Sequence, residues 1–360
     1  MEKISVFRWL LFPITFLYGV IGWLRNKLYD WNILKSTSFE GVRLIGVGNL
    51  SSGGTGKTPH VEYLVRQLKD TYNVAVVSRG YKRKTKGFVL ADAKSTALEI
   101  GDEPMQMYRK FAKDGVEVAV GEKRVKAVRK LLQLKPDIEV IVLDDVFQHR
   151  AIAVDTLILL TDFNHLFTED YVLPMGSLRE FQRGYQRADM IVVTKCPKRL
   201  NALEKLEIIA AIYPLPHQKL TFSFLKYQQP YAFVDKSVKL NWKRKKVDAV
   251  LVVCGIAKPE RVVEYVLALP KMNSWATDGE DKLETLFFDD HHDFSVADLE
   301  QIRTKFEALA AKYEHAIILT TEKDAVRLEL WQKELEEMEL LGRIFVLGVE
   351  VGFWDREGLF

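Results

Sequence analysis

The sequence predicts an α/β protein in which a doubly wound parallel sheet is followed by a second, smaller α/β domain. Three observations lead to this prediction. From residue 42 onward, short β-branched runs alternate with segments of helical periodicity. These runs are almost continuously apolar, as in strands that are buried on both faces of a parallel sheet. Finally, the 360 residues exceed the usual size of one domain, so two hydrophobic cores are expected.

The N-terminal segment, residues 1–30, differs from this soluble pattern. Its run 9–24 carries no charge, contains several aromatic residues and is flanked by Arg8, Arg25 and Lys27. A helix that spans a bilayer needs roughly 20 apolar residues, and this run is shorter and is interrupted by Pro13. We therefore predict a membrane-associated helix that lies in the interface or is partly inserted. A buried core helix and a cleaved signal peptide are the alternatives.

The remaining elements follow in order along the chain. In the first domain, 31–220, the predicted strands are 43–48, 74–78, 116–120, 140–144, 156–161 and 190–194, and the predicted helices include 59–68, 105–112 and 122–134. In the linker, 221–245, the alternating runs 219–227 and 231–240 predict a two-stranded ribbon that serves as a hinge. In the second domain, 246–360, we predict strands 249–254, 285–288 and 316–321, helices 259–267 and 296–312, and a solvated surface helix at 330–341.

Composition and charge exclude some classes of function. A formal net charge of +3 and the lack of an arginine-rich stripe in the sequence argue against a nucleic-acid partner. The two cysteines, Cys196 and Cys254, lie in apolar contexts far apart in sequence, which favours reduced thiols in the cytoplasm over a disulfide or a zinc site. We expect a monomer.

A glycine-rich segment directly after the first strand is the strongest functional signal. Its sequence, NLSSGGTGKT from Asn49 to Thr58, joins a predicted strand to a predicted helix, so backbone N–H groups and the helix dipole can bind phosphate oxygens. This arrangement is P-loop NTPase-like: Lys57 would reach the β- and γ-phosphates of ATP, and Thr58 would bind Mg²⁺. The predicted nucleotide-binding residues are Ser51, Ser52, Gly53, Gly54, Thr55, Gly56, Lys57 and Thr58. The alternative is a structural glycine turn, because Ser51 stands where the general motif has glycine.

Polar residues at the ends of other strands predict the rest of the site. Asp144 and Asp145 end an apolar strand, where a carboxylate can reach Mg²⁺, although either residue can instead cap a turn. Arg179 is predicted to balance developing phosphoryl charge, and Glu180 is a possible metal partner. The residues predicted to bind substrate lie at strand ends facing the same crevice, and they are Asn49, Arg79, Gln148 and His149.

Two further clusters suggest an acid–base pair drawn from both domains. Asp102 lies in GDEP, and His291 lies in DDHHDF, a cluster of acids and histidines at the end of a strand. An aspartate oriented by a histidine can take the proton of an attacking hydroxyl group. The alternatives are that Asp102 caps a helix and that the histidine is structural. Adjacent histidines on an extended chain point in different directions, so a shared metal is less favoured than one functional histidine.

With these motifs together, the sequence resembles the tetraacyldisaccharide 4'-kinase family, the lipid A 4'-kinases of Gram-negative bacteria. The resemblance covers nearly the whole chain and rests on motifs in the family's order, namely GNLSSGGTGKTP, SRGY, GDEP, LDDVFQHR, LPMGSLRE, VTK, CGIAKPERV, DDHHDF and TTEKDAVRL. It implies ATP- and Mg²⁺-dependent phosphorylation of the 4'-hydroxyl of a tetraacylated glucosamine disaccharide 1-phosphate, giving lipid IVA at the cytoplasmic face of the inner membrane. The family's catalytic aspartate corresponds to Asp102 and its partner histidine to His291.

The resemblance also bears on three positions at which this sequence departs from the general motif or from the family's pattern. The family loop tolerates a residue other than glycine at Ser51, His292 occupies a variable position, and Val146 replaces a residue that is often small. A rival function is a membrane-associated P-loop switch ATPase, but such proteins usually carry a second lysine near the start of the loop. A GTPase metallochaperone is also disfavoured, since Pro197 stands where a base-reading aspartate is expected after Lys195.

Overall fold

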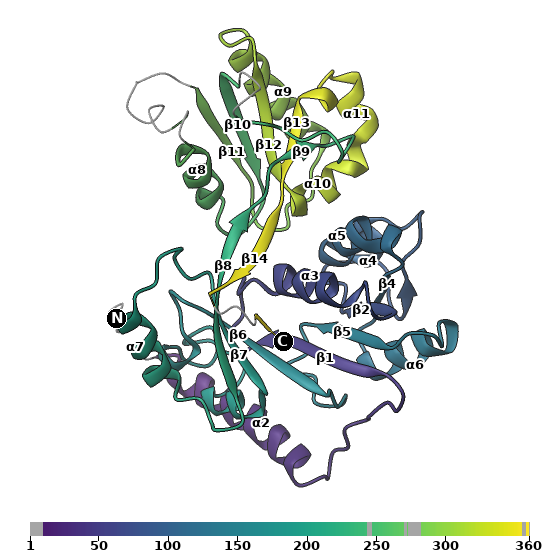
Figure 1. Ribbon diagram of the computed structural model, residues 1–360, viewed down its shortest axis with the longest axis vertical. Coiled ribbons are helices and arrows are strands. Elements are labelled where there is room, and N and C mark those ends of the chain that lie inside the picture. The colour runs from purple at the N-terminus through teal and green to yellow at the C-terminus, as the bar shows by residue number, and fades with distance from the viewer. Residues whose placement is uncertain (1–9, 243–246, 270–271, 273–281, 355–357, 360) are drawn as a thin grey trace. The chain divides into compact units, whose positions relative to one another are not determined.

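The computed structural model describes residues 10–242, 247–269, 272, 282–354 and 358–359 (Figure 1). The chain divides into two compact units. The first comprises Met1–Lys226 together with Glu350–Phe360, and the second comprises Tyr227–Val349. The predicted second domain ended at residue 360, whereas the last residues belong to the first unit, because the final strand pairs there. The start of the predicted membrane segment and the basic stretch 243–246 lie outside the described residues.

The first unit is built on a nine-stranded sheet in the order β14-β8-β7-β6-β1-β5-β2-β4-β3. Its strands are β1 (Arg43–Asn49), β2 (Val74–Ser78), β3 (Val89–Leu90), β4 (Glu117–Val120), β5 (Val140–Asp144), β6 (Thr156–Asp162), β7 (Met190–Thr194), β8 (Lys219–Tyr227) and β14 (Val349–Phe353). Its helices are α2 (Phe12–Asp30), α3 (Lys57–Leu68), α4 (Ala97–Ile100), α5 (Asp102–Phe111), α6 (Arg124–Leu134) and α7 (Ala202–Ile212), with short 3₁₀ turns η1 (Ala112–Asp114), η2 (Phe167–Glu169) and η3 (Gln182–Arg187).

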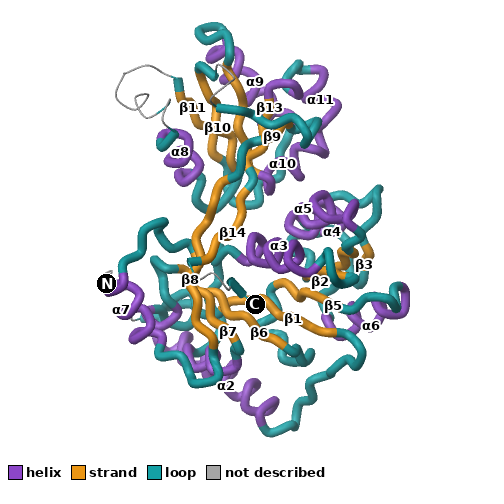
Figure 2. Tube along the Cα trace, viewed as in Figure 1, coloured by secondary structure: helices purple, strands orange, loops and turns teal. Residues whose placement is uncertain are grey.

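This sheet is doubly wound, with β1 at the point where the strand order reverses. From β4 to β8 across the sheet, neighbouring strands pair in parallel. Helices cover both faces, as Figures 1 and 2 show. All residues of β2, β5 and β7 are buried, which explains why their sequences are apolar throughout rather than alternating. The predicted fold class is confirmed. Because β1 is central, the loop after it opens at the usual ligand crevice of such sheets.

The predicted two-stranded ribbon at 221–245 is wrong in its pairing. The run 219–227 forms β8 in the nine-stranded sheet, whereas the next run contributes only β9 (Tyr231–Ala232) to the sheet of the second unit. The partner of β8 is β14, and the N–H of Trp354 donates to the carbonyl of Phe222 at 3.0 Å. Without β14, β8 would expose an unpaired edge. Alternation in the sequence therefore identified the strand but not its partner.

The second unit is a smaller α/β domain with a five-stranded sheet in the order β11-β10-β12-β13-β9. Its remaining elements are β10 (Ala249–Cys254), α8 (Glu260–Leu267), β11 (Leu283–Phe287), α9 (Val296–Ala310), β12 (Ala316–Thr321), α10 (Glu322–Leu328), η4 (Glu329–Trp331), α11 (Gln332–Glu337), η5 (Leu341–Arg343) and β13 (Ile344–Leu347). The predicted surface helix 330–341 is replaced by η4, α11 and η5. Leu335 is fully buried in the core under this segment, so the helix is not wholly solvated.

Helix α2 attaches to the first unit through small and polar residues. The Thr15 hydroxyl accepts a hydrogen bond from the Met175 N–H at 3.1 Å, and Gly19 lies so close to the Phe181 ring that a side chain there would collide with it. Large apolar residues instead face outward, and they include Phe12, Ile14, Phe16, Leu17, Ile21, Trp23 and Leu24. This arrangement reverses that of an ordinary surface helix. It contradicts the alternative of a buried core helix.

Among the described residues, none of the helices is both long and apolar enough to cross a bilayer.

Candidate active site

The backbone of the glycine-rich loop is fixed from outside by side chains of other elements. Four consecutive carbonyl oxygens each accept a hydrogen bond from a side-chain donor. They belong to Gly53, Gly54, Thr55 and Gly56, and their donors are respectively Asn49 Nδ2, Lys195 Nζ, Thr194 Oγ1 and His60 Nδ1. The buried His60 contact is short, at 2.7 Å, and because a carbonyl only accepts, Nδ1 must carry the proton. Burial lowers the pKa of His60 to about 4, so the ring is neutral near pH 7.

These contacts determine where the N–H groups of the loop point. A trans peptide directs its N–H opposite to its C=O. With the carbonyls held outside, the N–H groups of Gly54, Gly56 and Lys57 point to the other side, where α3 begins. Gly56 is the N-cap residue of α3 and has a φ of +87°, a left-handed conformation that favours glycine. The result is an anion cradle at a helix N-terminus.

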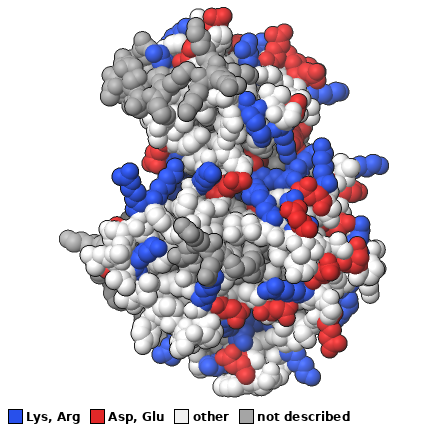
Figure 3. All heavy atoms as spheres, viewed as in Figure 1, with Lys and Arg blue, Asp and Glu red and all other residues white. Residues whose placement is uncertain are grey.

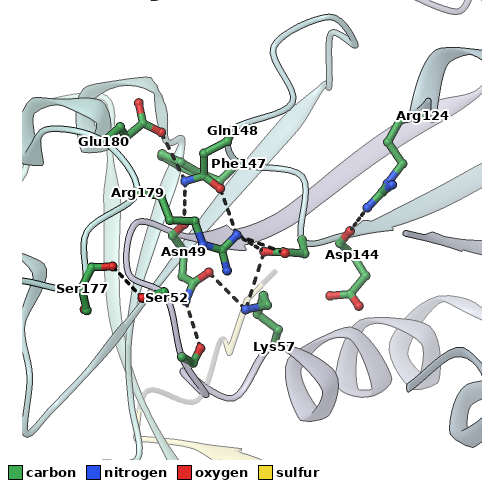
Figure 4. Close-up of polar contacts among 12 residues, drawn as sticks. Asn49, Ser52, Lys57, Arg124, Asp144, Phe147, Gln148, Ser177, Arg179 and Glu180 are labelled. Atoms are coloured by element: carbon green, nitrogen blue, oxygen red, sulfur yellow. Dashed lines mark hydrogen bonds and ion pairs between the residues drawn. The ribbon is translucent and has the colours of Figure 1, made fainter. Parts of the chain in front are cut away.

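Lys57 extends from this cradle into a network with the end of β5 (Figure 4). Its Nζ donates to Asn49 Oδ1 at 3.1 Å and lies 3.6 Å from Asp145 Oδ1. Arg179 Nη1 donates to the same carboxylate at 3.0 and 3.1 Å. Burial opposes ionisation of Asp145, but Lys57 and Arg179 outweigh it and lower the pKa. Asp145 is therefore an anion held between two cations, which keeps both of them beside the cradle.

Asp144 differs from its neighbour in that no cation among the described residues contacts its carboxylate. Its side chain is buried, and Oδ1 has no hydrogen-bond partner within the described parts of the chain. Burial and the adjacent Asp145 raise its pKa to about 6. A buried carboxylate oxygen without a donor, next to a phosphate cradle and the Thr58 hydroxyl at the start of α3, fits Mg²⁺. That ion prefers oxygen ligands and usually takes one or two carboxylates together with phosphates and water.

Glu180, the predicted metal partner, is held in an ion pair in this structure. Both of its oxygens pair with the Arg187 guanidinium at 2.9 Å, and they also accept hydrogen bonds from Asn26 at 2.6 Å and Gln148 at 3.2 Å. All four lone-pair directions of the carboxylate are thus occupied. Asn26 belongs to α2, so Glu180 also joins the N-terminal helix to the site.

Gln148 links this ion pair to the phosphate loop. Its Nε2 donates to the Asn49 carbonyl at 2.9 Å, and its Oε1 accepts from Arg179 at 3.3 Å. Figure 4 shows the amide lying between Arg179 and Glu180. The structure therefore brings together the predicted residues Asn49, Gln148 and Arg179 in one hydrogen-bonded network.

A concentration of positive charge surrounds His149. Burial, together with the nearby charges of Arg124, Arg79 and Arg25, lowers its pKa to about 4. Arg124 is almost completely buried and holds the carbonyls of Gly121 and Asp144 at 2.7 and 3.1 Å. Its Nε has no acceptor among the described residues. Three guanidinium groups around a neutral imidazole suit an anionic ligand.

Asp102 stands in the first turn of α5. The N-cap position is held by Gly101, which has a φ of +94°, so the interpretation of Asp102 as the N-cap residue is wrong. A side chain at Gly101 would lie 3.1 Å from the Tyr81 carbonyl, so the start of α5 is close to the loop that carries Arg79. Asp102 thus stands at a helix start that lies near Gly80 and Tyr81, the residues that follow Arg79 in sequence.

His291 lies in the second unit, in the loop after β11. Lys323 Nζ is 2.8 Å from His291 Nε2 and 2.9 Å from Asp290 Oδ1. An ammonium group only donates, so Nε2 accepts and the ring proton is on Nδ1. His291 also has a φ of +61°, which costs energy and fixes an unusual direction of the side chain. The neighbouring His292 is structural, since its Nε2 contacts Asp298, the residue that closes the capping box of α9 with Ser295.

Sequence reasoning missed several residues of the site. They are Asn26, His60, Arg124, Asp162, Lys195 and Arg187. Of these, Lys195 was considered only as a base reader, whereas its Nζ contacts the Gly54 carbonyl and lies 2.7 Å from Asp162. In the sequence, Lys195 is indicated by the polar pair Thr194–Lys195 at the end of β7, at the same sheet edge as the phosphate loop. Arg124 lies at the start of α6 and was not singled out by any motif.

Comparison with known proteins identifies the family. The sequence profile of the family described as Tetraacyldisaccharide-1-P 4'-kinase matches residues 7–360. The chain is 43% identical to a Tetraacyldisaccharide 4'-kinase of Bacteroides thetaiotaomicron over 97% of this chain and 89% of that protein. It is 41% identical to one of Flavobacterium johnsoniae, over 98% and 95%.

A solved structure is also similar along the whole chain. It is the crystal structure of the "apo" form of LpxK from Aquifex aeolicus in complex with ATP, with 29% identity, a TM-score of 0.71 and coverage of 98% of this chain and 96% of that one. The resemblance inferred from the motifs is confirmed. The chain belongs to the tetraacyldisaccharide-1-P 4'-kinase family.

Proposed function

We propose that this chain transfers the γ-phosphate of ATP to the 4'-hydroxyl of a tetraacylated glucosamine disaccharide 1-phosphate, giving lipid IVA. The observation that carries the proposal is the phosphate loop with its four held carbonyls, in a chain of this family. The Aquifex aeolicus relative was solved in complex with ATP, which supports ATP as the donor. The activity of a Tetraacyldisaccharide 4'-kinase, as the similar proteins are named, requires such a donor site.

On this proposal, the loop binds the triphosphate through backbone N–H groups and Lys57. Ser51 and Ser52 begin the loop, and the Ser52 N–H donates to the Ser177 carbonyl at 2.6 Å, which anchors the loop to the segment carrying Arg179. Thr58 and Asp144 would hold Mg²⁺, with Asp145 beside them. When bound, the ion neutralises charge on the β- and γ-phosphates. Arg179 adds a cation for charge that develops on the transferred group.

Asp102 is the proposed general base. Its carboxylate takes the proton of the 4'-hydroxyl as the oxygen attacks the γ-phosphorus, and ADP leaves with the electrons of the broken P–O bond. His291, with its proton on Nδ1, is the proposed partner that orients this carboxylate. Lys323 supports this role by occupying Nε2.

The acceptor is a lipid, so the chain must work at a membrane. Removing four acyl chains from a bilayer costs about 0.8 kcal/mol for each buried CH₂ group. The outward apolar face of α2 supports peripheral attachment at the cytoplasmic face of the inner membrane, and we propose a monomer there. Asn49, Arg79, Gln148 and His149 are the proposed acceptor-binding residues, and the arginines around His149 suit the lipid phosphate.

The test is phosphate transfer from radiolabelled ATP to the disaccharide 1-phosphate in detergent micelles with Mg²⁺. Asp102→Ala and His291→Ala should each nearly abolish transfer while leaving the circular dichroism spectrum unchanged. His217→Ala removes an exposed histidine and serves as the matched control. Hydrolysis of ATP without transfer to lipid would contradict the proposal and favour a switch ATPase.

A further inference from the structure

Helix α7 exposes an apolar face that its packing does not explain. Its inner side contributes Ile208 and Ile212 to the core beneath β7 and β8. On the outer side, Leu203, Leu206 and Tyr213 are 66%, 62% and 76% exposed. Leu203 and Leu206 are three residues apart and therefore lie on one side of the helix, and Tyr213 follows as its C-cap residue in a left-handed conformation. A soluble surface helix normally carries polar residues there, and a helix that is apolar all round is either buried or in contact with lipid.

Of the three charged residues of α7, only Glu207 is exposed, beside Leu206 at the edge of this face. Glu204 closes the capping box with Asn201. Lys205 lies over the rings of Phe222 and Trp354, at 5.3 and 5.6 Å from their centroids, so it points toward the sheet. In Figure 3, the surface at the position of α7 consists mainly of atoms from uncharged residues.

The segment around η3 contacts both α7 and the attached side of α2. Phe181, which precedes η3, packs against Gly19 of α2. Within η3, the Tyr185 hydroxyl donates to the Tyr213 carbonyl at the end of α7 at 3.1 Å. One short segment thus contacts both α2 and α7 and determines the distance between these two helices. Exposed cations lie beside α7 and η3, and they are Arg183, Lys198 and Arg199. They suit anionic headgroups at the edge of an apolar contact.

We propose that the outer face of α7 is a second membrane contact that rests on the same phospholipid surface as α2. This inference rests on the proposed function, in which the acceptor is a membrane lipid. A single helix in the interface leaves the protein free to rotate about the helix axis. A second contact removes that rotation and fixes the direction in which the first unit presents its site to the lipid.

The test compares binding of full-length variants to vesicles of phosphatidylethanolamine and phosphatidylglycerol by co-sedimentation. Leu206→Asp should lower the partition coefficient about tenfold or more, the effect expected from withdrawing one leucine from the apolar phase. Leu134→Asp is the matched control, because Leu134 is a 53% exposed leucine at the end of α6. Its partition should equal that of the wild type. Equal urea midpoints for both variants establish that they fold.

A second measurement places a reporter on the face. Cys196 and Cys254 are buried, so a new exposed cysteine is labelled selectively. An environment-sensitive dye on Leu206→Cys should shift to the blue with vesicles, and the dye on Leu134→Cys should not. The inference is overturned if both dyes behave alike or if Leu206→Asp binds vesicles as tightly as the wild type. It is also overturned if Leu206→Asp only dissociates a dimer in sedimentation velocity, because the face then binds a second copy.

Failure of this inference is separable from failure of the proposed function. Phe16→Asp tests the contact of α2 by the same co-sedimentation, and transfer in detergent micelles tests the activity without a bilayer. If Phe16→Asp weakens binding, Leu206→Asp does not, and micellar transfer is intact, only the second contact is refuted. Absence of micellar transfer in the wild type refutes the activity, whatever the vesicles show.

Discussion

Replacing Asp144 with asparagine is expected to stabilise the metal-free protein while removing its response to Mg²⁺. Asp144 is 8% exposed, and burial together with Asp145 raises the pKa of its carboxyl group from 3.8 to about 6. At pH values between these two pKa values, the Asp144 carboxyl keeps its proton in the folded state and loses it in the unfolded state. Stability therefore falls as the pH rises through this window, and the loss is complete above it.

The expected change in the free energy of unfolding follows from the pKa shift of Asp144. Two pKa units correspond to about 3 kcal/mol, which the ionised carboxylate costs the folded state at pH 8. Asparagine has nearly the same shape and cannot ionise, so Asp144→Asn should raise the free energy of unfolding by up to about 3 kcal/mol at pH 8. The gain should disappear below pH 4, where the carboxyl is protonated in both states.

Urea unfolding in EDTA at both pH values, followed by a Mg²⁺ titration at the higher one, measures these quantities. Mg²⁺ should stabilise the wild type and leave Asp144→Asn unchanged. Asp145→Asn is the matched control, and its effect on the free energy of unfolding should have the opposite sign. Its pKa is lowered despite burial, so its ionised form stabilises the fold above pH 4, and that contribution is lost on substitution. The reasoning fails if Asp144→Asn is the less stable protein at pH 8, or if Mg²⁺ stabilises both proteins equally.

Three further outcomes are expected. Lys57→Met should lower kcat/KM for phosphate transfer, measured by steady-state kinetics, by about 10² to 10³. The reason is that Lys57 is the only cationic side chain among the loop residues 50–58. Lys323→Met should lower kcat by about 10², because His291 loses the donor that fixes its tautomer; a change in melting temperature with kcat unaltered would contradict this. Gly19→Leu should destabilise by about 1–3 kcal/mol in urea unfolding, since the side chain meets a packed ring, whereas Gly22→Leu meets open space among the described residues and should be neutral.

The strands of the large sheet were predicted well from the sequence, because parallel strands buried on both faces are recognisable as short, continuously apolar runs. The predicted strands at 74–78, 140–144 and 190–194 coincide with β2, β5 and β7. The pairing of β8 was not predictable, because its partner β14 follows more than a hundred residues later and either edge of a strand can pair. Periodicity describes one segment at a time, and contacts between distant segments depend on packing.

The same distinction applies to the site. Lys57 and Asp144 were predictable because their roles depend on local geometry, a loop after one strand and the end of another. The ion pair of Glu180 with Arg187 was not predictable, because nothing in the motif of Glu180 indicates its partner. Arg124 was missed because a lone arginine at a helix start is usually solvated, and only the fold buries it.

The four donors that hold the phosphate loop have a consequence for the timing of the reaction cycle. They come from β1, α3 and the end of β7, so the loop is part of a rigid frame before nucleotide arrives. Ordering a free loop would subtract about 1–2 kcal/mol per residue from the affinity, and here folding has already met that cost. Nucleotide capture therefore need not wait for the loop to rearrange. Any slow conformational step must involve parts of the protein outside this frame.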